Sequence, residues 1–440
     1  MEELWRARWR VVKTANFIID NAGRTPDVAQ EEIDAAIGQA YYWRAYSYYY
    51  FVTAWGAVPM VIKDEINYNM PLSSVPEIYD LIVSDLKKAE EMVPNNYTRE
   101  PYVRNGMNIA VSRGAVKATL SYVYMTMAGW PLNKGTEYYK LAADKAKEVI
   151  DGAKNNTYYY RLLPQYKDVY SVKYNSQNPE VLLGIYYNRN IGAIVNNTLC
   201  DFLQDMAYGG GWDDTHGEIK FWKDFPEGPR KDATYFPKII LASEAKTKTL
   251  RDWWYDPDPE APRAVVAPCF MKTVEGAVQG EEFDYTNPAA LNQDGDNMHQ
   301  IIRLSEVYCW YAEAVGRSGQ GNITEAVNLL NEVRNRADGK ATNLYKTNMS
   351  YTDLAEAAYN EHGWEIAGYY WGNIAPRARD MFRMNRIKDH FEFRKQNPEI
   401  EVAPGVFRKE AVPVTGVWND SKMYLAYPNK DAAINPNLKN

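Results

Sequence analysis

Apolar residues that recur at steps of three and four predict that most of this chain is helical. The first such face runs from Trp5 through Trp9 and Val12 to Ile19, and Gly23 follows it as a stop signal. A helix with one apolar face must bury that face against a neighbour, so the helices are expected to pack on one another. Further faces of the same period predict helices over residues 31–54, 74–94, 111–128, 138–153, 302–319 and 322–337.

The predicted helices come in pairs joined by short turns, which limits the architecture further. Gly319 ends one helix and Asn322 caps its partner, with Glu325 completing the start signal. Small residues on the first helix and larger ones on the second are typical of a tetratricopeptide unit, although the consensus is degenerate here. Because a single pair cannot bury its own face, stacked pairs form a solenoid. The expected units are residues 31–94, 111–153, 299–339 and 351–390.

The middle of the chain has a different character. Gly, Pro, Asn, Asp and aromatic residues are frequent there, and Val181–Ile185 is a short strand-like stretch. Long irregular segments inside folded proteins are usually functional. We therefore predict a mainly α fold, a tetratricopeptide-like helix-pair solenoid with a large irregular, partly β insertion. The expected divisions are N-terminal helical repeats over 1–154, an irregular ligand-binding insertion over 155–298, and C-terminal helical repeats with an extended tail over 299–440.

The aromatic content narrows the classes of function. The chain has 35 Tyr, 13 Trp and 12 Phe, and Tyr and Trp combine a large apolar face with a polar atom that suits half-exposed surfaces. Most of the Tyr residues are expected to pack on helices with their hydroxyls reaching solvent, and the remainder are candidates for ligand contact. A net charge of −7 argues against a general nucleic-acid binder. The sequence has no apolar stretch that could span a bilayer, and its three Cys residues give no disulfide framework.

Few residues suggest an enzyme. Asp213 and Asp214, with His216 and Glu218 nearby, are the one group that suggests a glycoside hydrolase, which needs two carboxylates facing each other across a cleft. Adjacent carboxylates on an irregular segment more often cap turns or lie in solvent. The four His residues lack the spacing of a catalytic zinc site. Asn292–Asp296 resembles part of a calcium loop but lacks the required Glu, so we expect no cofactor, with a structural calcium as the alternative.

Motifs along nearly the whole chain, in the same order, resemble those of one family. Ala40–Tyr46 followed by Trp55–Pro59 resembles RAYxYF…YGxVPL, and residues 78–89 resemble IYxxIxxDLxxA. Residues 302–337 resemble xRxAEVxLxxAEA…LNxVRxRA, and Tyr427–Asn440 resembles a PIP…NPNLxQN terminus. Each motif is weak alone, but the combination resembles the SusD/RagB family of outer-membrane nutrient-binding lipoproteins.

The resemblance implies a non-catalytic surface lipoprotein that captures oligosaccharides for import and caps a SusC-like TonB-dependent transporter. It also implies an outer-membrane location through an N-terminal lipid anchor. Because a signal peptide, the lipid-bearing Cys and several dozen residues before the first helix are missing, we expect a truncated chain. His362 stands where the family's ERxxEL helix has its first Arg, which predicts an altered salt-bridge network. Some relatives are thought to take peptides, so a peptide is the alternative cargo.

We predict a shallow surface site made by the loop after the second helix together with the middle segment. Flat aromatic rings stack on the CH faces of sugars, while amides and carboxylates bind the hydroxyls. Trp253 and Trp254 cannot both point one way if the segment is extended, so at most one is expected to be a platform, and core packing is the alternative role of each Trp. The predicted ligand-binding residues are Asn67, Tyr68, Trp212, Asp213, Trp253, Trp254, Tyr255, Tyr285 and Asn287.

Binding at such a site is expected to be weak. If each ring removes about 50 Å² of sugar from water at about 25 cal/mol per Å², it contributes roughly 1.2 kcal/mol. After the cost of association is subtracted, two or three rings with a few hydrogen bonds give a binding free energy of about 4–7 kcal/mol. This corresponds to millimolar to ten-micromolar affinity. Replacing the platform residue, by Trp212→Ala or Trp254→Ala, is expected to abolish measurable binding in isothermal titration without unfolding the chain. Unchanged affinity in both single variants and in the double variant would contradict the site.

Overall fold

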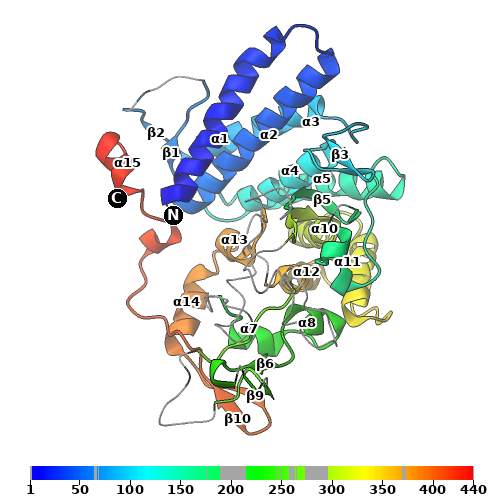
Figure 1. Cartoon of the computed structure of the whole chain (residues 1–440), viewed down its shortest axis with the longest axis vertical. Coiled ribbons are helices and arrows are strands. Elements are labelled where there is room, and N and C mark those ends of the chain that lie inside the picture. Colours follow the sequence, from blue (N-terminus) through cyan, green and yellow to red (C-terminus); the bar gives the residue numbers. More distant parts are fainter. Residues whose placement is uncertain are drawn as a thin grey trace.

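The computed structural model describes residues 2–63, 67, 69–175, 177–188, 215–244, 246–247, 249–256, 263, 265–272, 296–368 and 373–439. The helices stack in a curved array, and a smaller lobe lies at one end of the long axis (Figure 1). The N-terminal helices are α1 (Glu2–Asn21), α2 (Gln30–Trp55), α3 (Val75–Met92), α4 (Arg113–Ala128) and α5 (Thr136–Lys154). The C-terminal helices are α10 (Leu304–Ser318), α11 (Ile323–Asp338), α12 (Tyr351–Ile366), α13 (Arg377–Arg383), α14 (Ile387–Gln396) and α15 (Asn429–Ile434).

The helix boundaries predicted from start and stop signals are confirmed at three places. Ser74 and Glu77 form a reciprocal capping box at the start of α3. Gly319 follows α10 in the left-handed conformation (φ 64°), which glycine adopts without a Cβ clash. Asn322 accepts a hydrogen bond from the backbone N–H of Glu325 at the start of α11.

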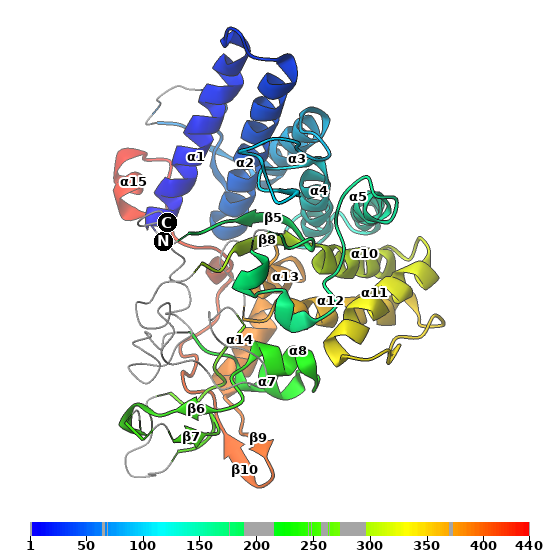
Figure 2. The same ribbon diagram turned by 45° about the vertical axis from the view of Figure 1, so that its right-hand side comes forward.

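The packing order confirms a helix-pair array interrupted by an insertion. Helix α2 packs against α1 and α3, α4 packs against α5, and α10 packs against both α5 and α12. The array therefore continues directly from α5 to α10, and the middle segment leaves it between these two helices (Figure 2).

Buried tyrosines join α2 to α4, and their hydroxyls do not reach solvent as we expected for most Tyr residues. The Tyr42 hydroxyl lies 3.1 Å from the hydroxyl of Thr119, and the Tyr49 hydroxyl lies 3.0 Å from that of Thr126. Each pair satisfies two polar groups inside the core, so burial of the ring carries no unsatisfied hydroxyl. The Tyr-rich sequence of α2 is therefore a packing feature at these positions.

Among the described residues, the strands form five two-stranded sheets, and one of these sheets corrects a prediction. Ile302 does not continue the face of α10, because it lies in strand β8 (His299–Arg303), which pairs antiparallel with β5 (Val181–Ile185). A short apolar run before a helix has the same pattern in either structure, and pairing with a distant strand decides between them. The other sheets pair β1 (Val58–Pro59) with β2 (Leu72–Ser73), β3 (Val103–Arg104) with β4 (Met107–Asn108), β6 (Ile239–Ile240) with β7 (Leu250–Arg251), and β9 (Ile400–Ala403) with β10 (Val406–Arg408).

The smaller lobe has a hydrophobic core of its own. Short helices α7 (Ile219–Asp224) and α8 (Pro229–Thr234) lie there with the β6–β7 and β9–β10 hairpins (Figure 1). Ile240 and Trp253 from the middle of the chain pack in one cluster with Val402 from β9. Residues on both sides of the predicted division at 298 therefore share this core.

A buried ion-pair cluster holds the middle segment to the C-terminal helices. Glu180 and Glu365 have 0% exposed side chains, and each binds both Arg303 and Arg336, with N–O distances between 2.5 and 3.0 Å. Arg230 of α8 lies 3.0 Å from Glu365. Burial raises the pKa of Glu365, but the three arginines outweigh burial and hold this pKa well below its usual range. Glu365 is therefore ionised, and α8, α11, α12 and the end of β8 meet around it.

Removing one partner of this cluster is expected to destabilise the fold. Glu365→Gln takes one carboxylate partner away from each of three buried arginines, so the free energy of unfolding is expected to fall by about 3–5 kcal/mol. Urea denaturation followed by circular dichroism measures this difference. Glu399→Gln is the matched control, because Glu399 and its partner Lys409 are both exposed and a surface pair contributes about 0–1 kcal/mol. Equal losses in the two variants would contradict the role of the cluster.

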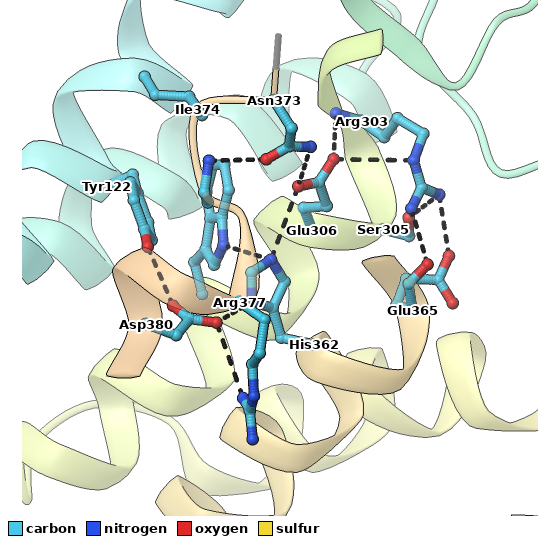
Figure 3. A network of polar contacts seen from close by, with 12 residues as sticks. Tyr122, Arg303, Ser305, Glu306, His362, Glu365, Asn373, Ile374, Arg377 and Asp380 are labelled. Atoms are coloured by element: carbon cyan, nitrogen blue, oxygen red, sulfur yellow. Dashed lines mark hydrogen bonds and ion pairs between the residues drawn. The ribbon is translucent and has the colours of Figure 1, made fainter. Parts of the chain in front are cut away.

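A second buried network surrounds His362 between α10, α12 and α13 (Figure 3). Its Nδ1 lies 2.6 Å from Asp380 Oδ2, and its Nε2 lies 3.6 Å from Glu306 Oε2. Burial lowers the pKa of His362, but Asp380 and Glu306 outweigh burial and raise this pKa to about 9. The indole N–H of Trp310 also reaches Nε2 at 3.2 Å, a bond that only the neutral ring accepts. When His362 is protonated, Nε2 carries a hydrogen, so it can donate to Glu306 and can no longer accept from Trp310.

The raised pKa of His362 predicts that stability depends on pH. A folded-state pKa of about 9 against an ordinary value of 6.5 means that the folded chain binds the proton more tightly. The contribution is fully present below pH 6.5 and is lost as the pH rises towards 9. Relative to His362→Gln, the wild-type free energy of unfolding is expected to fall over this range by at most about 3 kcal/mol. Urea denaturation at both pH values measures it, and parallel curves for the two proteins would contradict the assignment.

Candidate functional site

The consecutive aromatic residues after β7 lie on the surface of the smaller lobe's core. Trp253 is 2% exposed, and its ring contacts those of Trp222 and Trp254 at centroid distances of 5.0 and 5.3 Å, nearly perpendicular to both. Trp254 and Tyr255 are half-buried, and the Arg251 guanidinium lies over the Tyr255 ring, 4.4 Å from its centroid. The two Trp side chains are therefore not equivalent. Trp253 has no face to offer a ligand in this structure, and Trp254 stays our prediction for the platform.

Two arginines fix the backbone that carries these rings. Arg263 Nη1 donates to the backbone oxygens of Trp253 (2.8 Å) and Tyr255 (2.7 Å), on either side of Trp254. Arg408 of β10 donates from Nε and Nη2 to the backbone oxygen of Trp254 itself, at 2.9 and 2.6 Å. Hydrogen bonds from charged donors are among the stronger ones in proteins. The backbone of Trp254 is thus held by one arginine nearby in the sequence and by one from a remote hairpin.

Asn67 lies at a different place, in a pocket that we call the terminal pocket. This pocket has a volume of about 300 Å³ and lies between α1, the segment joining β1 to β2, and the C-terminal segment around α15. Asn67 is exposed, and its Oδ1 accepts a hydrogen bond from the backbone N–H of Asn69 (2.9 Å). The lining of the terminal pocket includes Trp9, Val61, Asn67, Met70, Asp431 and Leu438.

The structure separates the described members of the predicted site. The β1–β2 segment lies beside the N-terminal helices, and β7, which precedes Trp254, lies in the smaller lobe at the other end of the long axis (Figures 1 and 2). The described residues of the single shallow site predicted from the sequence therefore lie in two separate places. Outside the described residues lie Tyr68, Trp212, Asp213, Asp214, Tyr285, Asn287 and residues 292–295 of the calcium-like stretch.

Sequence reasoning missed Trp9 and Asp431 as possible ligand contacts. Trp9 belongs to the helical face of α1 and reads as a core residue, while Asp431 begins a short helix near the C-terminus. Nothing in the local pattern of either residue indicates that the other is near. Only the packing of the C-terminal segment against α1 brings them into one pocket.

The described titratable groups give little support for catalysis. Glu218, which the hydrolase alternative placed near Asp213 and Asp214, has its Oε1 2.9 Å from His390 Nε2. The His362–Asp380 pair resembles a general-base dyad, but both side chains are 0% exposed, so a substrate does not reach them in this structure. In the part of the chain that the structure describes, no three His, Cys, Asp or Glu residues are grouped as metal ligands. None of the helices described has the length and apolar character needed to cross a membrane.

Comparisons with known proteins agree with this fold. Residues 1–125 match a family model described as starch-binding associating with outer membrane, and residues 261–439 match the model of the SusD family, SusD_RagB. SusD-like protein P2 of Formosa agariphila is 25% identical over 362 residues, which are 79% of this chain and 64% of that protein. The chain thus spans just under two thirds of the length of this relative.

Solved structures share the fold over the whole chain. A protein crystallised with a xylogluco-oligosaccharide superposes with a TM-score of 0.72 at 21% identity, covering 99% of this chain and 86% of that one. A SusD-like carbohydrate binding protein of Bacteroides fragilis superposes with a TM-score of 0.73 at 18% identity, covering 100% and 86%. At these identities the superpositions establish the fold alone. The family models that match residues 1–125 and 261–439, with the SusD-like relative, show that this chain belongs to the SusD/RagB family.

Proposed function

We propose that this chain is a non-catalytic cell-surface protein that captures oligosaccharides and passes them to a partner SusC-like TonB-dependent transporter. The observation that carries the proposal is the SusD/RagB fold together with the sugar ligands of proteins that share it. One such protein was solved with a xylogluco-oligosaccharide, and another is named a carbohydrate binding protein. The proposal includes an outer-membrane location through a lipid anchor in the full-length protein, supported by the family's described association with that membrane.

The geometry around Trp254 supports a glycan as the cargo. Trp254 is half-buried rather than enclosed, and Arg263 and Arg408 hold the backbone on which it stands. A platform that is already fixed loses little conformational entropy when a ligand binds, so a small apolar contact gives useful affinity. Tyr255, half-buried beside it, adds a phenol hydroxyl that can donate to or accept from a sugar hydroxyl.

The carboxylates near this platform support binding without hydrolysis. A glycosidase needs one carboxyl group that stays protonated near neutral pH and acts as the acid. Asp252 is paired with Lys238 at 2.6 Å, and Glu244 is paired with Arg251 at 2.6 Å. Hydrogen bonding from Arg251 lowers the pKa of Glu244, which is the opposite of what an acid catalyst requires.

Isothermal titration of the purified chain tests the proposal. The titrants are a panel of oligosaccharides and, in parallel, a mixed peptide digest, and the products in the same samples are then analysed. We expect saturable binding of at least one oligosaccharide, with millimolar to ten-micromolar affinity and no cleavage, because two or three ring contacts with a few hydrogen bonds, less the cost of association, leave only about 4–7 kcal/mol. Trp254→Ala is expected to remove this binding.

Trp418→Ala is the matched control, because Trp418 is also half-buried but packs on Phe391, away from the platform. Its affinity is expected to equal that of the wild type. Cleavage of a bound glycan would overturn the non-catalytic assignment and favour the hydrolase alternative at Asp213 and Asp214. Binding of peptides without glycans would keep the fold and replace the cargo.

A further inference from the structure

The terminal pocket is a preformed cavity at the junction of three segments that are far apart in the sequence. Its volume of about 300 Å³ lies at the lower end of the range for small-molecule sites, about 300–1,000 Å³. Asn435 Nδ2 donates to the backbone oxygen of Met70 (2.9 Å), and the Tyr427 hydroxyl donates to that of Ala57 (2.6 Å). These bonds hold the C-terminal segment against the β1–β2 segment, so the cavity does not depend on a ligand to form.

One wall of the terminal pocket is aromatic. Trp9 is half-buried, and its ring packs on Phe51 at a centroid distance of 4.5 Å and against the edge of Trp5 at 5.6 Å. The side chains of Val61, Met70 and Leu438 extend the apolar lining. The remaining face of Trp9 is thus a fixed apolar surface at the side of a small cavity. A pyranose ring presents CH groups that suit such a surface.

The polar groups of the pocket are only partly satisfied by the described residues. Asp431 Oδ2 is buried and has no hydrogen-bond partner among the described residues; Arg6 Nε is 4.0 Å away, beyond hydrogen-bond range. Asn67 Oδ1 accepts a hydrogen bond from the backbone N–H of Asn69. The side-chain N–H groups of Asn67 can donate to other acceptors. A carboxylate oxygen without a hydrogen-bond partner is unfavourable, so a ligand that supplies a donor to this carboxylate is favoured. A sugar hydroxyl can donate to the carboxylate and accept from the amide.

We propose that the terminal pocket is a second sugar subsite, which takes one uncharged sugar unit of a glycan and is separate from the Trp254 platform. The inference rests on the proposed capture of oligosaccharides and adds a specificity to it. The volume limits the pocket to a small unit, Trp9 supplies the stacking face, and Asp431 and Asn67 bind hydroxyl groups. The Asp431 carboxylate, whose side chain is 30% exposed, disfavours an acidic sugar, because a uronate would bring a second negative charge next to it.

Saturation-transfer NMR with methyl glycosides tests the subsite, because it detects millimolar binding of single sugar units. The probes are the neutral methyl glucoside, galactoside, mannoside and N-acetylglucosaminide, and the methyl glucuronide and galacturonide. At least one neutral probe is expected to bind. Asp431→Ala and Asn67→Ala are each expected to weaken it about tenfold, while Trp418→Ala, at a ring that packs on Phe391, leaves it unchanged.

Asp431→Asn separates ligand contact from a structural role, since it keeps the shape of the side chain and removes its charge. The preference for neutral over uronate probes is expected to fall about fivefold in this variant. Asp420→Asn is the matched control, because Asp420 is exposed in the same C-terminal segment and bonds Trp418. Its preference is expected to match the wild type.

The outcomes distinguish this subsite from the proposed function. Oligosaccharide binding that persists while no neutral methyl glycoside binds would overturn the subsite alone. Neutral probes that bind equally well to wild type, Asp431→Ala and Asn67→Ala would also overturn it, as would uronates that bind as tightly as neutral probes. Binding of single sugars that requires Asp431, in a chain that takes no oligosaccharide, would keep the pocket and overturn the capture of glycan chains.

Discussion

The pairing of Glu180 and Glu365 with Arg303 and Arg336 is the interaction on which the arrangement of the chain depends. All four side chains are buried, and charges out of contact with water are tolerated only where each meets an opposite charge. Glu180 precedes β5 in the middle segment, whereas the other three lie on β8, α11 and α12. The middle segment can therefore dock on the helical array in the one position that neutralises these charges, and the β5–β8 sheet forms at that position.

This docking determines where aromatic side chains meet solvent. The smaller lobe is built from the middle segment and the β9–β10 hairpin, and Arg408 of that hairpin fixes the backbone of Trp254. At the other end of the molecule, the C-terminal segment closes the terminal pocket against α1. At the Trp254 platform and at the terminal pocket, residues distant in the sequence help to fix the segment that carries an aromatic ring. Rigid rings suit a receptor of modest affinity, because little of the contact energy is lost to ordering the protein.

The helical part of the fold was predictable because its signals are local. Capping at Ser74 and Asn322 and the stop at Gly319 need only the neighbouring residues, and the structure confirms each. Ile302 was assigned to a helix because its partner strand lies outside any local window. Most Tyr hydroxyls were expected to reach solvent, and that of Tyr42 does not, because Thr119, which binds it, lies on another helix. Of the predicted ligand residues, the burial of Trp253 and the pocket around Asn67 could not be read from the sequence either.

The sequence by itself determined the helices, their caps, the presence of an irregular middle segment and the family, because apolar period, capping residues and motif order are properties of neighbouring residues. The tertiary structure alone decided that Trp254 and not Trp253 faces solvent, and that Trp9 and Asp431 share a pocket. These features depend on which remote segments pack together. That packing is decided by the burial of apolar area and the neutralisation of buried charge over the whole chain.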